Sequence, residues 1–296
     1  MNTVIGIPAY NEEKNIASII IKLKKITDKI IVCDDGSSDL TAEIAEKMGV
    51  IVISHSRNRG YGAAISSIFT KFIETDDDIL VTFDADGQHR IEDINKIILP
   101  IQENKADIVI GSRFLDEENT EIPKYRKIGI KAITNVTNVG TETKLTDSQS
   151  GFRAYHKRVF PKILPSDQGM GVSTEILIKA TKNEYRIKEV SIIILYPKGS
   201  STHHPVSHGA SVIFSTMKFI SIEHPLKFYG IPGLVFFAIG LSFVIWSVQI
   251  FSDSGEVLTN VALIGFGSTI FGTMLGMTAI MLYSLVNVVR EGKNAN

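Results

Sequence analysis

The sequence has little cysteine and little net charge, which argues against a disulfide-linked protein and against a protein that binds nucleic acid through its overall charge. Its single cysteine, Cys33, cannot form an internal disulfide and lies in the apolar run 30–33, which fits a reducing cytosol. The formal net charge of −1 provides no global field to gather nucleic acid, so an anionic ligand must be held by a local cluster. We therefore expect no nucleic-acid partner.

Charged residues are missing from two long segments near the C-terminus, Phe228–Phe251 and Val257–Val289. Each exceeds the roughly 20 apolar residues needed to cross a bilayer. The sequence therefore predicts transmembrane helices at about 228–251 and 260–289 rather than a buried core hairpin. Lys227 precedes the first segment and Arg290 follows the second, so the positive-inside rule predicts cytoplasmic termini in a two-span protein of the cell membrane. The opening residues show no signal-peptide pattern.

Short apolar runs alternate with longer amphipathic ones between residues 3 and 110, a pattern typical of βα units. The sequence thus predicts an α/β fold with a doubly wound, mostly parallel sheet in a domain of residues 1–208. An interfacial amphipathic helix at 209–226 and a membrane region at 227–296 are expected to follow. Expected strands lie near 3–7, 29–33, 50–53, 79–83 and 107–110, and expected helices near 13–25, 39–48, 60–74 and 91–104.

Polar, carboxylate-rich segments follow the predicted strands, at the edge where an α/β sheet binds ligands. Neither the glycine spacing of a Rossmann dehydrogenase nor the Gly-Lys-Ser/Thr of a Walker loop is present. Asp84 and Asp86 lie two apart at a strand end and Gln88 adds a neutral oxygen, a donor set that suits Mg²⁺ or Mn²⁺. Such an ion neutralises a diphosphate leaving group; the alternative is a pair of solvated turn aspartates.

Two further strand ends offer contacts to a nucleotide. Asp34 and Asp35 precede the turn at Gly36, where one carboxylate accepts hydrogen bonds from a base or ribose and the other caps the turn. We choose Asp35 for the nucleotide. Tyr10 can lie against the base and Pro8 can shape its loop, although either is equally explained as a packed loop residue.

Five segments are found in a characteristic order: Pro8-Ala9-Tyr10-Asn11-Glu12, Val32-Cys33-Asp34-Asp35-Gly36-Ser37-Ser38-Asp39, Asn58-Arg59-Gly60-Tyr61-Gly62-Ala63-Ala64, Asp84-Ala85-Asp86-Gly87-Gln88-His89 and Gly111-Ser112-Arg113-Phe114. Together they resemble glycosyltransferase family 2, and more narrowly its dolichyl-phosphate mannose or glucose synthase branch. The resemblance implies a GT-A fold, inversion at the anomeric carbon, and Mg²⁺ or Mn²⁺ at Asp84, Asp86 and Gln88. The nucleotide-sugar site that we assign with its help consists of Pro8, Tyr10, Asn11, Glu12, Asp35, Gly60, Asp84, Ala85 and Asp86.

The acceptor side can be reasoned from charge. A phosphate acceptor is already ionised at neutral pH, so it needs cations more than a strong general base. Arg113 follows a predicted strand, and Arg126 lies in a basic segment, 125–131, that can form an amphipathic helix at a membrane surface. In the similar synthases, arginines in these two places hold the lipid phosphate. The alternative is that both are ordinary surface arginines.

The loop before the first span departs from the mannose synthases, which tend to carry an arginine and a Gly-x-Ser-Lys pattern there. Lys198, or one of the histidines His203, His204 and His208, replaces that cation at a phosphate in our interpretation. This departure leaves the sugar and the nucleotide open.

Two acidic residues downstream have open roles. Asp147 begins the segment Asp147–Arg153, which resembles the acceptor loop of the family, and it either contacts the sugar or acceptor or only braces the loop. Glu175 either binds a sugar hydroxyl or is simply a first-turn helix residue. The Gln-x-x-Arg-Trp motif of processive polysaccharide synthases is absent, so we expect transfer of one sugar rather than polymerisation.

The leading hypothesis is an inverting hexosyltransferase that moves one sugar from GDP-mannose, UDP-glucose or UDP-GlcNAc to dolichyl or polyprenyl phosphate. Transfer is expected at the cytoplasmic face of the membrane. A second hypothesis gives the sugar to a lipid hydroxyl or lipid-linked glycan, which requires a general base, Asp147 or Glu175. A third is a non-catalytic membrane scaffold, against which the intact set of Asp84, Asp86 and Gln88 argues. The sequence leaves the oligomeric state open.

Overall fold

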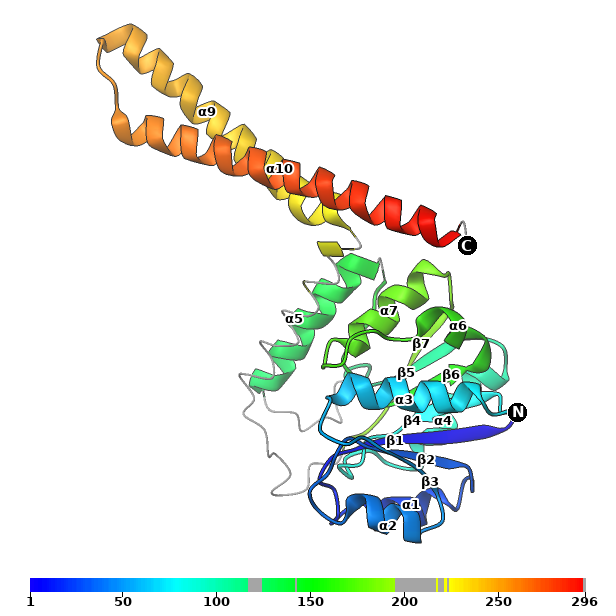
Figure 1. The fold of residues 1–296 in the computed structure, drawn as a ribbon. Coiled ribbons are helices and arrows are strands. Elements are labelled where there is room, and N and C mark those ends of the chain that lie inside the picture. Colours follow the sequence, from blue (N-terminus) through cyan, green and yellow to red (C-terminus); the bar gives the residue numbers. More distant parts are fainter. Residues whose placement is uncertain (117–123, 142, 195–216, 218–220, 223, 295–296) are drawn as a thin grey trace. The chain divides into compact units, whose positions relative to one another are not determined.

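The computed structural model describes the chain except for residues 117–123, 142, 195–216, 218–220, 223 and 295–296. The chain divides into two compact units, Met1–Thr216 and Met217–Asn296. The first unit contains an α/β domain and the second contains a pair of long helices (Figure 1). The interfacial helix predicted at 209–226 falls largely outside the described residues.

Among the described residues, the first unit is built on a seven-stranded sheet with the order β3-β2-β1-β4-β6-β5-β7. Its strand pairs are parallel except for those of β6, which runs antiparallel between β4 and β5. The prediction of a mostly parallel α/β sheet is confirmed. The strands are β1 (Thr3–Ala9), β2 (Ile30–Asp34), β3 (Ile51–Ser54), β4 (Ile79–Thr82), β5 (Ile108–Ser112), β6 (Arg153–His156) and β7 (Ile187–Ser191).

Helices pack on both faces of this sheet. One face contacts α1, α2 and α4, and the other contacts α3, α6 and α7. The four helices expected before residue 110 are present, each within its predicted span. The helices of the first unit are α1 (Ile16–Leu23), α2 (Thr41–Lys47), α3 (Tyr61–Ile73), α4 (Asp93–Gln102), α5 (Lys124–Thr141), α6 (Phe160–Ile163) and α7 (Val172–Lys182).

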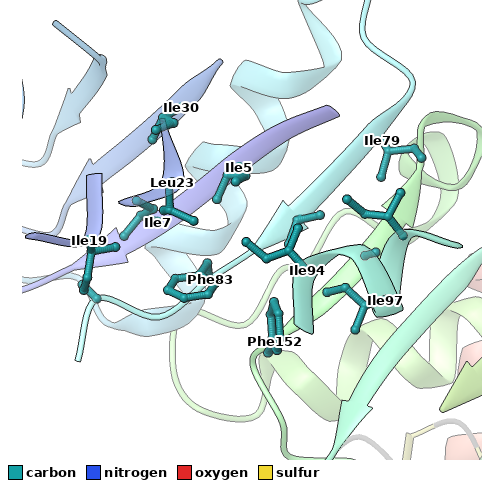
Figure 2. Packing of buried hydrophobic residues seen from close by; sticks show 14 of the residues in the cluster. Ile5, Ile7, Ile19, Leu23, Ile30, Ile79, Phe83, Ile94, Ile97 and Phe152 are labelled. Carbon is teal, nitrogen blue, oxygen red and sulfur yellow. The ribbon is translucent and has the colours of Figure 1, made fainter. Parts of the chain in front are cut away.

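Burial on both faces explains why the strands read as continuous apolar runs. Successive residues of a strand point to opposite faces. Ile5 and Ile7 of β1 belong to the cluster that packs against α1 and α4 in Figure 2, whereas Val4 belongs to the cluster on the other face. Each such side chain contributes about 1.5–3 kcal/mol of hydrophobic stabilisation when fully buried.

The antiparallel strand β6 brings a loop to the ligand-binding edge of the sheet. Its first residue, Arg153, pairs with Thr82 at the end of β4 and with Ile110 near the end of β5. The preceding segment, residues 146–151, therefore lies at the carboxyl ends of the parallel strands, where α/β sheets bind ligands. Neither β6 nor β7 was among the strands predicted from the sequence.

The second unit is a helical hairpin of α9 (Ile231–Ser254) and α10 (Thr259–Asn294). Leu226–Ser254 and Thr259–Val288 have mean hydropathies of 2.2 and 1.7, with 6% and 11% of their most apolar windows buried. Both helices are thus long and apolar enough to cross a membrane, whereas the core helices of a soluble protein bury their apolar faces. These properties support the two predicted spans.

Glycines allow close packing of the two hairpin helices. A Cβ added at Gly240 of α9 would clash with the backbone of Thr269, and one at Gly272 of α10 would clash with the backbone of Phe237. The two backbones therefore approach each other at small residues, as in many membrane helix pairs.

Candidate active site

The loops after β1 and β2 are tied together at the edge of the sheet. Ser38 N donates to Asn11 Oδ1 at 2.9 Å, and Asn11 N donates to Ser37 Oγ at 2.9 Å. Asn11 adopts a left-handed conformation with φ of 56°. Pro8 is buried within β1, whereas the Tyr10 side chain is 42% exposed and can lie against a ligand. Asn11 therefore ties the two loops together, whereas Pro8 is a buried residue of the strand.

Asp35, the predicted nucleotide carboxylate, organises the loop before α3. Its Oδ1 hydrogen-bonds His55 Nδ1 at 2.6 Å and accepts from Arg59 N at 3.0 Å, and its Oδ2 accepts from Gly60 N at 2.7 Å. The Gly60 backbone has φ of 100°, a conformation that favours glycine. The structure therefore joins the predicted residues Asp35 and Gly60 in one contact.

The neighbouring Asp34 caps the turn, as one of the two aspartates was expected to do. Its Oδ2 accepts from Ser37 N at 3.2 Å. Its Oδ1 is buried and has no hydrogen-bond partner within the described part of the protein. Buried acceptors are normally satisfied, so Asp34 is a candidate for ligand contact that the sequence analysis passed over in favour of Asp35.

The two aspartates after β4 face different partners. Asp84 Oδ1 accepts from Tyr61 OH at 3.2 Å, and Asp84 Oδ2 lies 3.1 Å from His89 Nε2. Burial opposes ionisation of Asp84, but the contacts with His89 and Tyr61 outweigh it and lower its pKa. Asp86 Oδ1 accepts from Gln88 N at 3.0 Å, so the turn around Gly87 folds back on itself.

Negative charge accumulates on this side of the site. The pKa of Glu12 is raised by burial and then by the negative charges of Asp86, Asp39 and Asp84, while the hydrogen bond from Asn15 partly offsets the rise. This dependence places Glu12, from the loop after β1, within electrostatic reach of the two β4 aspartates. The charges of the predicted residues Asp84 and Asp86 therefore act on the predicted residue Glu12.

The donor atoms present fit a hard divalent cation that keeps other ligands. Across the described residues, no group of three or more His, Cys, Asp or Glu side chains forms a complete protein cage for a metal. Mg²⁺ characteristically uses one or two carboxylates together with water and substrate phosphates. Asp84 and Asp86 would supply such carboxylates, in a region of excess negative charge. Gln88, predicted as a third ligand, is buried beside them and keeps that role as a prediction.

On the other side of the site, Arg113 and Asp147 form a buried ion pair. Arg113 follows β5, and its backbone N, Nε and Nη2 donate to the Asp147 carboxylate at 3.2, 2.6 and 2.8 Å. Asp147 is 0% exposed. Burial alone would raise its pKa, but the Arg113 guanidinium outweighs burial and lowers it. The predicted residues Arg113 and Asp147 thus act as one unit.

The segment Thr146–Gly151 connects the two sides of the site, and we name it the acceptor loop. Asp147 at its start holds Arg113, whereas Gly151 at its end touches the donor side. A Cβ added at Gly151 would lie 2.5 Å from Tyr61 OH and 2.8 Å from Asp84 Oδ2. The positive charge of Arg113 also helps to lower the pKa of Asp84, so the two sides lie close enough to interact.

Glu175 braces a loop. Its carboxylate accepts hydrogen bonds from Ser166 N at 2.9 Å, Ser166 Oγ at 2.6 Å and Asp167 N at 2.8 Å, and pairs with Lys179 at 2.8 Å. Burial opposes its ionisation, but Lys179 and the Ser166 contacts outweigh burial and lower its pKa. Glu175 was expected either to bind a sugar hydroxyl or to be a first-turn helix residue. These contacts favour the second role, a structural residue in the first turn of α7.

Several predicted acceptor residues are only partly described or not described. Arg126 lies in α5, but its side chain falls outside the description. Lys198 and the three loop histidines, His203, His204 and His208, lie in the segment 195–216, which is outside the described residues. Their roles stay predictions.

The sequence analysis missed Tyr61 and His89 as site residues, although both stand inside the quoted motifs. Tyr61 begins α3 directly after Gly60, and His89 follows Gln88. The sequence analysis also missed the buried Arg153. Its side chain donates to the carbonyl oxygens of Ser148 at 2.7 Å and Ser150 at 2.8 Å. The signal for Arg153 was its place at the end of the motif Asp147–Arg153.

A cavity of about 310 Å³ is lined by the chain neighbours of Arg113 and Asp147. Phe114 follows Arg113 in the chain and Thr146 precedes Asp147, and both residues line this cavity. The lining combines apolar and polar side chains with one cation: Phe114, Lys131, Thr134, Asn135, Leu145 and Thr146.

The mostly parallel sheet, the antiparallel insertion of β6 and the carboxylates after β4 define a GT-A-like α/β domain. A model of the family described as glycosyl transferase family 2 matches residues 4–164. The chain belongs to this family and is a glycosyltransferase. The family and enzyme class expected from the sequence motifs are thereby confirmed.

Two curated relatives and one solved structure illustrate the similarity. A UDP-N-acetylglucosamine–dolichyl-phosphate N-acetylglucosaminyltransferase of Methanococcus voltae is 35% identical over 228 residues, covering 70% of this chain and 89% of the relative. A dolichyl-phosphate hexose transferase of Haloferax volcanii is 31% identical over 220 residues, covering 74% and 93%.

The fold is also similar to that of glucosyl-3-phosphoglycerate synthase from Mycobacterium tuberculosis, solved in complex with Mn²⁺, uridine diphosphate and phosphoglyceric acid. The TM-score is 0.59 at 19% sequence identity, with 74% of this chain and 78% of that chain covered. At this identity the likeness supports the fold.

Proposed function

We propose that this glycosyltransferase moves a single sugar, with inversion, from a nucleotide diphosphate sugar to a polyprenyl or dolichyl phosphate at the cytoplasmic face of a membrane. The two relatives named above carry dolichyl phosphate in their names, which supports a lipid phosphate acceptor. The apolar hairpin of α9 and α10 supports a membrane location. Among the donors expected from the sequence, UDP-GlcNAc is the first to test, because one of these relatives is named for it.

The observation that carries the proposal is that both acidic candidates for a general base are already paired with cations. Asp147 is bonded to Arg113 and Glu175 to Lys179, and the pKa of each carboxyl is lowered. A general base works best with a pKa near the operating pH. A hydroxyl acceptor would need such a base, whereas a phosphate acceptor is already ionised and needs a cation.

Arg113 supplies that cation beside the donor site. Its guanidinium is fixed by Asp147, so it is oriented before the acceptor arrives, which lowers the cost of placing two anions together. The adjoining cavity combines Phe114 and Leu145 with Lys131, a composition suited to the part of a lipid next to its phosphate. Arg126 and Lys198 are proposed as further phosphate contacts.

On the donor side, Asp84 and Asp86 would hold Mg²⁺ or Mn²⁺, with Gln88 as a further ligand. The ion, when bound, neutralises the diphosphate so that it can leave. The proposed nucleotide-sugar contacts are Pro8, Tyr10, Asn11, Glu12, Asp35, Gly60 and Ala85. His89 and Tyr61 orient Asp84 through its two carboxylate oxygens.

The full-length protein can be tested with radiolabelled nucleotide sugars, Mn²⁺ or Mg²⁺, and either polyprenyl phosphate or the matched polyprenol. We expect a labelled, mild-acid-labile lipid with the phosphate and none with the alcohol. Labelled product from the polyprenol alone would establish the hydroxyl acceptor. Metal-dependent nucleotide binding without transfer to either lipid would count against the proposal, and absence of such binding would favour a non-catalytic scaffold.

The variants Asp147→Asn and Glu175→Gln separate base catalysis from loop bracing. If either carboxylate were the base, turnover would collapse while both substrates still bound. With a phosphate acceptor we expect Asp147→Asn to raise the KM of the acceptor, because Arg113 loses its ionic partner, and Glu175→Gln to lower thermal stability more than turnover.

A further inference from the structure

The carboxylate of Glu189, on β7, accepts hydrogen bonds from the start of the acceptor loop. Its Oε1 accepts from Asp147 N at 2.9 Å, and its Oε2 accepts from Thr146 N at 2.8 Å and from Thr146 Oγ1 at 3.1 Å. Burial raises the pKa of Glu189, and the hydrogen bonds from Thr146 and Asp147 partly offset the rise. One carboxylate thus holds two consecutive backbone amides of the loop.

The residue that Glu189 holds is the one that orients the acceptor arginine. Asp147 gives its backbone amide to Glu189 and its carboxylate to Arg113. A second link runs through Thr146, whose Oγ1 lies 2.6 Å from the Oγ of Ser112, the residue before Arg113. The position of Arg113 therefore depends on where Thr146 and Asp147 are held.

Glu189 lies on a regular strand of the sheet, β7. Glu189 pairs with Ile110 of β5, and the same register places Ser112 opposite Ser191. Because β5 and β7 are parallel neighbours, Glu189 lies one strand away from the segment that leads into Arg113. A carboxylate on a hydrogen-bonded strand is a firmer support than one on a loop.

We infer that Glu189 is a positioning residue that sets the place of the acceptor-site cation, Arg113, through the Thr146–Asp147 backbone. It acts through Asp147 and is not itself a catalytic residue. The inference rests on the proposed function, in which Arg113 binds the acceptor phosphate. Glu189 holds Thr146 and Asp147 at the start of the acceptor loop, whereas the contact with the donor side is made by Gly151 at its end, so donor binding should change little in a Glu189 variant.

Glu189→Gln is the informative variant, because it keeps the shape of the side chain. An amide has one acceptor oxygen, and its NH₂ group would face an N–H donor of the loop, so at least one contact to Thr146 or Asp147 is lost. We expect the KM for polyprenyl phosphate to rise about tenfold. The dissociation constant of UDP with Mn²⁺ should change by less than about twofold.

Asp107→Asn is a matched control at the other end of β5. Asp107 is also buried and pairs with Arg158 and Arg186, but it precedes the strand, whereas Ser112 ends it. This variant should lower the melting temperature and leave the KM for the lipid phosphate unchanged. A rise in that KM in both variants would show a general effect of lost stability and would overturn the inference.

Hydrogen exchange of the full-length protein in detergent gives a readout that does not depend on activity. In Glu189→Gln, the amides of Thr146 and Asp147 and the Nε–H of Arg113 should exchange faster, whereas Asp107→Asn should leave all three unchanged. Unchanged exchange at Arg113 Nε–H would overturn the inference, as would faster exchange with an unchanged acceptor KM. If the wild-type protein transfers sugar to no polyprenyl phosphate, the proposed function falls, and the Arg113 signal still decides whether Glu189 positions this arginine.

Discussion

The donor side and the acceptor side of the site have opposite electrostatic character. On the donor side, burial raises the pKa of Glu12, and the negative charges of Asp86 and Asp84 raise it further. On the acceptor side, Asp147 is also buried, but Arg113 neutralises it and lowers its pKa. Carboxylates of the same chemistry thus meet opposite environments, a cluster of like charges on one side and an ion pair on the other.

This difference suggests how the two substrates are handled. A divalent cation bound with the nucleotide would stabilise the crowded carboxylates of the proposed donor side, so donor affinity should depend on metal. The acceptor arginine is already fixed by the protein and should need no metal to bind a phosphate. The acceptor loop, which touches both sides, is the element through which one can affect the other.

The largest effect is expected from Asp86→Asn, which removes a donor-side charge. A neutral amide is a weaker ligand for a hard cation, so kcat/KM should fall about a thousandfold and metal-dependent UDP binding should be lost. Turnover and calorimetry with Mn²⁺ measure both. Asp77→Asn is the control, because Asp77 pairs with Lys29 and precedes β4, at the opposite end of that strand from Asp86. Retention of turnover within about tenfold in Asp86→Asn would remove the metal from the proposal.

Arg113→Lys tests the other side of the comparison. Lysine keeps the charge but cannot reproduce the bidentate contact with Asp147, so the KM for polyprenyl phosphate should rise about thirtyfold. UDP binding in the presence of Mn²⁺ should be unaffected. Arg158→Lys, which alters the pair with Asp107 away from the site, serves as the matched control. Equal weakening of donor and acceptor would contradict the division of the site into two sides.

Gly151→Ala tests the connection between the two sides. The new methyl group would lie 2.5 Å from Tyr61 OH and 2.8 Å from Asp84 Oδ2, so the loop or Asp84 must move. We expect kcat/KM to fall about tenfold, with weaker metal-dependent UDP binding although the substitution lies in the acceptor loop. Gly129→Ala in α5 meets nothing within 4 Å and is the control. Unchanged UDP binding would show that the contact between the loop and Asp84 is unimportant.

The smallest expected effect is that of pH on turnover above neutrality. The pKa values of Asp147 and Glu175 are lowered, so both carboxyls stay ionised from mildly acidic pH upward and add no limb to the profile near pH 7. Below neutrality, the rate at low acceptor concentration should fall as the lipid phosphate takes up a proton, with a pKa of about 6. A limb above about pH 7 that disappears in Asp147→Asn or Glu175→Gln would instead identify a general base.

The lowered pKa of Asp147 also predicts how the stability of the fold changes in acid. Asp147 has a lower pKa in the folded protein than its ordinary value of about 4, so its ion pair stabilises the fold at neutral pH. This contribution is lost as the pH falls through the lower, folded-state pKa. Chemical denaturation of Asp147→Asn should therefore show a shallower loss of stability in acid than the wild-type protein.

The elements with a strong local signal were predictable. The strand β4 and the periodic helices α1 to α4 lie within the expected spans, and β1 continues two residues past its expected end, because hydrophobic periodicity is a property of neighbouring residues. Asp84 and Asp86 were found for the same reason, since they directly follow an apolar strand. The antiparallel strand β6 was not predicted, because its four residues carry no pattern that distinguishes them from a loop.

The sequence identified the residues of the acceptor side but not the contacts between them. Arg113 and Asp147 were both selected from the sequence, but as separate candidates. They are 34 positions apart and form an ion pair only because β6 returns the chain to the end of β5. Glu175 was considered as a base and is engaged with Ser166 and Lys179, which the sequence did not reveal.

The sequence by itself determined the family, the position of the donor aspartates and the two membrane-length helices, because each depends on residues close together in the chain. Tertiary structure decided which carboxylates are paired and which are crowded. The pKa of a carboxyl depends on charges within a few ångströms, and those charges come from strands distant in sequence. Asp147 and Glu12 belong to the same class of residue, and only the arrangement of the sheet gives one an arginine and the other two aspartates.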